Sequence, residues 1–316
     1  MANITTSGAG LYNPQLTEIV EEAFERAGTE LRSGYDLRTA RRSLNIMFAE
    51  WANRGINMWT MDQQTITLVQ GQSTYAIPSD TVDLLEQVIR TQANSTSNQS
   101  DLNITRISVS TYQTIPNKLT QARPIQILVN RQDAQQSPTT ITVANAVAAT
   151  DTTITLTSTV GLPAYGFISI DQEIIFYQYI SGNTINTCAR GQNNTTAASH
   201  AVAAPVLIQY LPSVTVWPVP DGSQTYTLAY VRLRRTQDAG GGVNVMDIPF
   251  RFLPCMIAGL AYYLAMKLPP TPDMQNRLIL LKQQYDEAWQ MAAEEDREKA
   301  AIRFVPRQMF IGNGGT

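Results

Sequence analysis

The chain has 316 residues, of which 43% are hydrophobic and 16% are charged, and its formal net charge is −3. This length predicts two or three structural units. The acidic balance argues against a protein that works mainly by neutralising nucleic-acid phosphates. The N-terminal residues have neither the basic nor the apolar region of a signal peptide, and no apolar run is long enough to span a membrane, so we expect assembly in the cytoplasm.

The charge content is well below the roughly 25% of an average soluble protein, and Gln, Asn, Thr and Ser are abundant instead. A polar but weakly charged surface is typical of a subunit whose flanks are covered by neighbours, and it also fits a β-rich monomer. The two cysteines, Cys188 and Cys255, form no C-x-x-C pair, so we expect both to be small buried hydrophobic residues.

Residues 1–60 predict two amphipathic helices. The first follows Asn13-Pro14, which we expect to cap it, and ends at Gly28. The second begins near Asp36, carries apolar residues at helical spacing and ends at Gly55.

The middle of the chain is rich in short strands. Residues 61–134 and 210–245 alternate apolar and polar residues between turn-forming segments, which predicts a β-domain. Between them, residues 135–209 shift to Thr, Ala, Val and Ile with hardly any charge. We interpret 135–209 as a small all-β module inserted into a loop of the β-domain, because the entropy cost of closing a loop grows slowly with its length.

Residues 246–301 predict two more helices, the first almost wholly apolar and the second capped by Thr271-Pro272. The glycine run at 240–242 before them is expected to act as a flexible hinge. The simplest arrangement packs the helices from both chain ends into one antiparallel bundle, so the predicted fold class is α+β.

The last residues, 302–316, are apolar without periodicity and end in a Gly-rich segment. Such a segment seldom folds alone, and we expect it to be an extended tail that inserts into a partner. Its candidate anchors are Phe304, Val305, Met309, Phe310 and Ile311.

Residues that could carry chemistry are few. His200 is the only histidine and has no cysteine or second histidine beside it, so a structural role is favoured over metal binding or catalysis. Asp171 and Glu173 lie two apart on what looks like one strand, which would place both carboxylates on one face. No catalytic, cofactor-binding or metal site is predicted.

Arg232, Arg234 and Arg235 form the densest basic group. No aromatic residues alternate with them as on a base-stacking surface. We expect them to form salt bridges to a neighbouring subunit, with contact to DNA in a channel as the alternative.

Several segments resemble the head-to-tail adaptor proteins of short-tailed bacteriophages (podoviruses). Their order along the chain is more specific than any one of them. They are residues 40–55 (ARRSLN to EWANRG), 75–78 (YAIP), 105–108 with 115–118, 216–220 (VWPVP) with 226–235, 249–254 (PFRFLP) with 259–265 (GLAYYLA), and 294–299 with 305–307.

This resemblance implies a structural virion protein that forms a dodecameric ring beneath the portal protein. The tail of each subunit would insert at the portal, the lower face would receive the tail nozzle protein, and DNA would pass through the channel without specific binding. Residues 161–200 are also similar to a small β-module of phage tail and baseplate proteins, in which Glu173 and Arg190 would pair. That module could brace subunits, hold a tail fibre or contact the capsid.

Two rival functions have sequence features of their own. A cell-wall hydrolase carried on the adaptor would need two convergent carboxylates, of which Glu173 is the candidate. A module that binds host glycans would need aromatic side chains facing solvent, for which Tyr177 and Tyr179 are the candidates.

Overall fold

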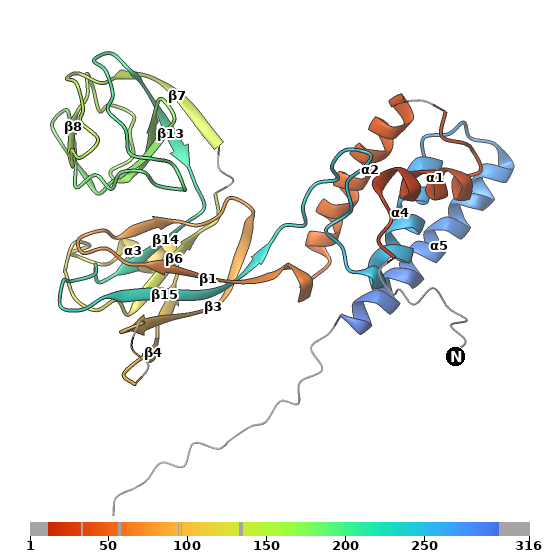
Figure 1. Cartoon of the computed structure of the whole chain (residues 1–316), viewed down its shortest axis with the longest axis horizontal. Coiled ribbons are helices and arrows are strands. Elements are labelled where there is room, and N and C mark those ends of the chain that lie inside the picture. The colour runs from red at the N-terminus through yellow and green to blue at the C-terminus, as the bar shows by residue number, and fades with distance from the viewer. Residues whose placement is uncertain are drawn as a thin grey trace, which may run out of the picture. The chain divides into compact units, whose positions relative to one another are not determined.

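The computed structural model of the chain describes residues 12–32, 34–55, 58–93, 95, 97–132 and 135–296. It is a mixed α+β protein with several small sheets and a β-rich body, which confirms the predicted fold class. The chain divides into two compact units (Figure 1): unit 1 combines residues 1–59 and 236–316, and unit 2 is residues 60–235. No helix in the described part of the chain is long and apolar enough to cross a membrane.

Unit 1 is helical, and helices from both ends of the chain share one hydrophobic core. Helix α4 packs against the other three, and most of its residues are buried, as expected for a helix that is apolar on nearly all sides. The helices are α1 (Leu16–Ala27), α2 (Gly34–Asn53), α4 (Leu253–Ala265) and α5 (Pro272–Glu295), with short 3₁₀ turns η1 (Met58–Thr60) and η2 (Phe250–Phe252).

The start of α1 differs from the prediction. Gln15, not Asn13, is the N-cap residue, and its side chain makes no capping bond. The backbone N–H groups of Leu16 and Thr17 instead donate to the carbonyl oxygens of Asn244 and Gly242. Gly242, the last residue of the predicted flexible hinge, and Asn244 therefore cap α1, because their backbone carbonyls satisfy donors that a helix start leaves without partners.

Two other predicted helix boundaries are confirmed, while α2 begins and ends two residues earlier than predicted, at Gly34 and Asn53. Gly28 ends α1 in the left-handed conformation at φ 85°, which glycine adopts without steric cost. The Thr271 side chain accepts a hydrogen bond from the backbone N–H of Met274 and caps α5. Cys255 on α4 and Cys188 in unit 2 are both free and buried, as expected.

The core of unit 1 is centred on the buried indole of Trp51. Its Nε1 donates to Tyr285 Oη at 2.8 Å, and the rings of Phe48, Phe252 and Trp289 surround it at centroid distances of 5.8, 5.7 and 5.1 Å. Aromatic pairs at such distances stabilise a core beyond the area they bury.

Two four-stranded sheets with a common hydrophobic core form the body of unit 2. One sheet is antiparallel, and in the other β5 and β6 pair in parallel. The first has the order β1 (Met61–Thr67), β15 (Tyr226–Arg234), β3 (Thr81–Thr91), β4 (Ser100–Asn103); the second has the order β2 (Thr74–Ala76), β14 (Ser213–Trp217), β6 (Gln126–Asn130), β5 (Thr105–Ile107). A short helix, α3 (Val109–Gln113), follows β5 and was not predicted.

Residues 135–210 build two further sheets around a hydrophobic core of their own. We call these residues the β7–β13 region. One sheet has the order β10 (Glu173–Tyr177), β9 (Gly166–Ile170), β13 (Pro205–Tyr210), β7 (Gln135–Thr142), and the other has the order β11 (Tyr179–Ser181), β12 (Thr184–Asn186), β8 (Thr153–Thr155).

Candidate functional site

The β7–β13 region contains a buried cluster of charged side chains beside the turn that joins β9 to β10. Asp171 occupies that turn at φ 54°, and Glu173 is the first residue of β10. The two carboxylates therefore do not lie on one strand as predicted. They are nevertheless brought together, because each contacts a different nitrogen of the His200 ring.

The Glu173 carboxylate is the centre of the cluster, and its side chain is 1% exposed. Arg190 donates to both oxygens, from Nε to Oε1 at 2.8 Å and from Nη2 to Oε2 at 2.7 Å. The backbone N–H groups of Gly191 and Ala198 add bonds at 2.9 and 3.0 Å. His200 Nε2 lies 2.8 Å from Oε2. The pairing of Glu173 with Arg190 expected from the resemblance is confirmed.

These partners decide the ionisation of Glu173. Burial by itself raises the pKa of a carboxyl group, but the hydrogen bonds from Arg190, the two backbone N–H groups and His200 outweigh it. Together they lower the pKa of Glu173 to about 2. The carboxylate is therefore charged at neutral pH.

Arg190 uses its guanidinium to connect loops as well as to bind Glu173. Nη1 donates to the carbonyl oxygens of Ala148 and Asp151 at 2.6 and 3.2 Å, and Nη2 also donates to that of Ala198 at 2.6 Å. Together with the two bonds to Glu173, this engages all five donors of the planar group. The ion pair thus fixes three loop segments around the start of β10.

His200 has no nitrogen left for catalysis. Its ring is buried, with Nδ1 2.8 Å from Asp171 Oδ2 and Nε2 2.8 Å from Glu173 Oε2. A histidine base needs one ring nitrogen directed at a nucleophile or a substrate. Here both nitrogens face carboxylates, so the ring acts as a link between the turn and the buried Glu173.

The cluster also lacks the geometry of a glycosidase. Such enzymes place two carboxylates on opposite sides of an open cleft. Asp171 and Glu173 instead contact the two nitrogens of one imidazole, and Glu173 is buried among donors from Arg190, Gly191 and Ala198. Among the described residues, no group of three or more His, Cys, Asp or Glu side chains is arranged to hold a metal ion.

Arg232, Arg234 and Arg235, at the end of β15, do not share one environment. Arg232 is 6% exposed and bonds within its own chain to Asp62, Asp80 and Thr81. Arg232 therefore has ion-pair partners inside unit 2, and its predicted role toward a neighbouring subunit or the channel stays untested. Arg235 is exposed and Arg234 is half-buried, and the prediction for these two stays untested.

The tyrosines predicted to bind glycans and the residues predicted to anchor the portal have different outcomes. Tyr177 is buried, and its hydroxyl donates to the carbonyl oxygen of Pro163 at 2.7 Å, so it cannot face a glycan in solvent. Tyr179 is 43% exposed. The expected portal anchors lie outside the described residues: Phe304, Val305, Met309, Phe310 and Ile311.

No protein-family model matches this chain, and no curated protein is similar enough to serve as a relative.

Proposed function

We propose that the chain is a ring-forming head-to-tail adaptor of a short-tailed phage, a structural virion protein that docks on the portal and joins it to the tail nozzle. In this proposal the four long helices of unit 1 form an antiparallel bundle. Residues 135–209 are a module inserted into the β-domain, where a tail fibre or the capsid could bind. The residues after 301 reach the portal, and DNA passes through the assembled channel.

The observation that carries the proposal is an apolar surface on α5. Ile279, Leu280 and Met291 are 70%, 54% and 67% exposed. Leu280 and Met291 are eleven residues apart, which is close to three turns, so they lie on one face of the helix. Two large apolar side chains exposed on the same face of one helix offer contact points that a partner subunit could cover. The surface fits the contact between two subunits of a ring.

The distribution of charge fits a DNA conduit. Ion pairs within the chain neutralise part of its positive charge, which lowers its affinity for phosphates. Among the described residues these pairs include Arg26–Glu22, Arg54–Glu50, Arg90–Asp101, Arg106–Asp83, Arg190–Glu173, Arg232–Asp62 and Arg251–Asp296. A channel wall of this kind would let DNA slide past without holding it.

A double substitution, Leu280→Glu with Met291→Glu, tests the α5 surface. We expect a folded protein that stays monomeric and no longer forms rings with portal, as measured by mass photometry and negative-stain electron microscopy. Val160→Glu is the matched control, because Val160 is 87% exposed but lies in unit 2. Rings that form equally well with both variants would contradict the proposal.

The anchor assignment has a separate test. Deleting the residues after Ala301 should leave a protein that melts at the same temperature but no longer attaches to portal in a co-sedimentation assay. Unchanged attachment would show that the C-terminal residues are not the anchor.

A further inference from the structure

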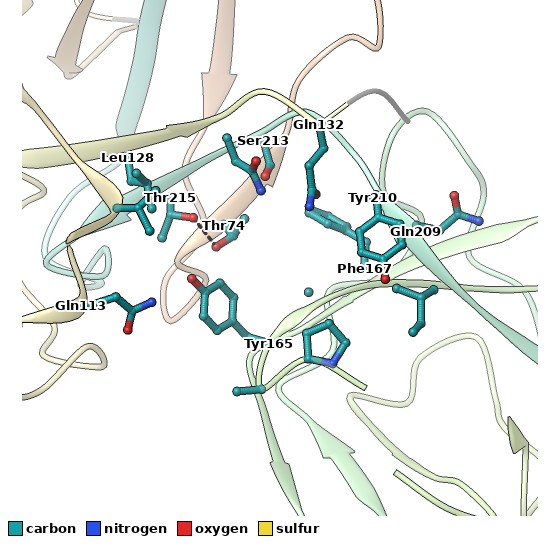
Figure 2. Close-up of a pocket in the computed structure, with 16 residues that line it drawn as sticks. Thr74, Gln113, Leu128, Gln132, Tyr165, Phe167, Gln209, Tyr210, Ser213 and Thr215 are labelled. Carbon is teal, nitrogen blue, oxygen red and sulfur yellow. Dashed lines mark hydrogen bonds between the residues drawn. The ribbon is translucent and has the colours of Figure 1, made fainter. Parts of the chain in front are cut away.

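Unit 2 contains a cleft that is lined by none of the site residues predicted from the sequence. It encloses about 330 Å³, between the sheet β2-β14-β6-β5 with α3 on one side and strands β9 and β13 on the other. Figure 2 shows Tyr165 and Tyr210 on opposite sides of this space, and Thr74, Thr215 and Ser213 also line it. The volume falls at the lower end of the roughly 300–1,000 Å³ of small-molecule sites.

The floor of the cleft is rigid and closed. Thr74, Thr215 and Phe167 are at most 5% exposed, and the two threonine hydroxyls are hydrogen-bonded to each other at 2.9 Å. Phe167 packs against the buried Phe176 at a centroid distance of 5.2 Å. A floor held in this way needs no rearrangement to accept a ligand, which lowers the entropy cost of binding.

The walls are two tyrosines that keep part of their surface open. Tyr165 and Tyr210 are half-buried. The Tyr165 ring packs against a hydrophobic cluster that contains Tyr112, which is 2% exposed, so the ring is held in place. A tyrosine at a binding surface offers an apolar ring face together with a polar hydroxyl.

Uncharged amides form the rim. Gln113, Asn130 and Gln132 are exposed, and Figure 2 shows the Gln132 side chain extending between Ser213 and Tyr210. Each amide carries both donors and an acceptor. Because the rim side chains are exposed and make no contribution to the hydrophobic cores, they can be changed without loss of the fold.

Charge is missing from the lining. Of the described residues that line the cleft, none is Asp, Glu, Lys, Arg or His. A charged ligand would lose hydration there without meeting an opposite charge, which is costly. The site therefore favours a neutral ligand that has apolar faces for the aromatic rings and hydroxyl groups for the amides.

We propose that this cleft binds a short neutral saccharide. Pyranose rings combine an apolar C–H face, which packs on Tyr165 and Tyr210, with hydroxyl groups that bond the amides of Gln113 and Gln132. The inference does not rest on the adaptor function. Free oligosaccharides and the repeating units of a surface polysaccharide share this chemistry, and an uncharged peptide is the competing ligand that the test must separate.

The test uses the full chain and a panel of neutral hexose and N-acetylhexosamine oligosaccharides from one to six units, measured by saturation-transfer NMR and calorimetry at millimolar concentration. We expect at least one neutral oligosaccharide to bind. Sialylated and glucosamine oligomers, which carry charge, should bind more weakly. If binding requires several linked units, a polysaccharide is the source, whereas equal binding of single units indicates a free sugar.

The variant for this test is the double substitution Gln113→Ala with Gln132→Ala, which removes two sets of hydrogen bonds and should weaken binding about tenfold. Gln172→Ala is the matched control, since Gln172 is an exposed amide in the β9–β10 turn. The proposal fails if no neutral saccharide of the panel binds, or if the double variant binds like the control. It also fails if an uncharged Gln- and Thr-containing peptide binds the cleft in preference to every saccharide.

Discussion

The core of unit 1 and the β7–β13 region order their chains by different means. Around Trp51, stability comes from apolar and aromatic packing, and the helices satisfy their own backbone hydrogen bonds. The β7–β13 region consists of short strands joined by loops, and its loop carbonyls and N–H groups need side-chain partners. The Glu173–Arg190 pair supplies them at Ala148, Asp151, Gly191 and Ala198.

This difference shows that a buried ion pair can be a requirement of the local architecture and not a sign of chemistry. In the β7–β13 region the pair takes the place of regular secondary structure, because it bonds backbone groups of several loops. Removal of the Glu173 charge and low pH should therefore destabilise the β7–β13 region more than unit 1. A larger side chain in the helical core should destabilise unit 1.

The largest effect is expected from Glu173→Gln. The substitution leaves the Arg190 guanidinium buried without its counter-charge, which typically costs about 3–5 kcal/mol. Hydrogen exchange should show loss of protection in β9, β10 and β13, with α1, α2, α4 and α5 unchanged. Asp171→Asn is the control, because the Asp171 side chain is 55% exposed and its change should have little effect. An equal loss of protection in unit 1 would contradict the claim that the ion pair stabilises only the β7–β13 region.

Low pH should destabilise the β7–β13 region more than unit 1. The pKa of Glu173 is about 2 in the folded chain, below the 4.5 of a free glutamate. A group whose folded pKa is lowered stabilises the fold above its unfolded pKa and loses that contribution as pH falls toward the folded pKa. The β7–β13 region should therefore lose roughly 3 kcal/mol between pH 5 and pH 2.

Urea unfolding followed at several pH values would measure this loss. Glu173→Gln should remove most of the acid dependence of that region, while Asp171→Asn keeps it. An acid dependence that survives in Glu173→Gln would assign the effect to another group.

A larger side chain on α4 should destabilise unit 1. A methyl group at Gly259 on α4 would lie 2.5 Å from Met47 Sδ and 2.8 Å from Tyr285 Cε2. Gly259→Ala should thus destabilise unit 1 by about 1–3 kcal/mol despite the higher helix propensity of alanine. Gly34→Ala, where a methyl group meets no atom within 4 Å, is the control. Thermal unfolding of the two variants gives the comparison.

The smallest effect is expected at Arg232. Arg232→Met keeps most of the apolar stem and leaves Asp62 and Asp80, which are 32% and 46% exposed and can be hydrated. A loss of about 1 kcal/mol in unit 2 is expected, with ring formation unchanged. If Arg232→Met instead abolished ring formation at unchanged stability, Arg232 would have the intersubunit role that its sequence context suggested.

Periodicity explains why the helices were predictable. The apolar spacing in residues 16–27 and the cap at Thr271 are local signals, and the structure reproduces both elements. Helix α3 was missed because five residues are too few to show a period, although Ser108 at its start was an available capping signal. The role of Gly242 was missed because its partner, Thr17, is distant in sequence.

The candidate sites depend on long-range contacts, and these limit what sequence reasoning can find. Glu173 and His200 are 27 residues apart, and the structure alone brings them to 2.8 Å. The lining of the cleft comes from five separate segments, so no motif marks it. The pairing of Glu173 with Arg190 was anticipated only through the resemblance of residues 161–200 to a small β-module of phage tail and baseplate proteins.

Electron microscopy of the full chain mixed with a portal ring tests the central claim most directly. We predict closed rings of this chain stacked coaxially on one face of the portal, with α5 of each subunit covered by its neighbour. A chain that stays monomeric and separate from portal at micromolar concentration would contradict the adaptor assignment.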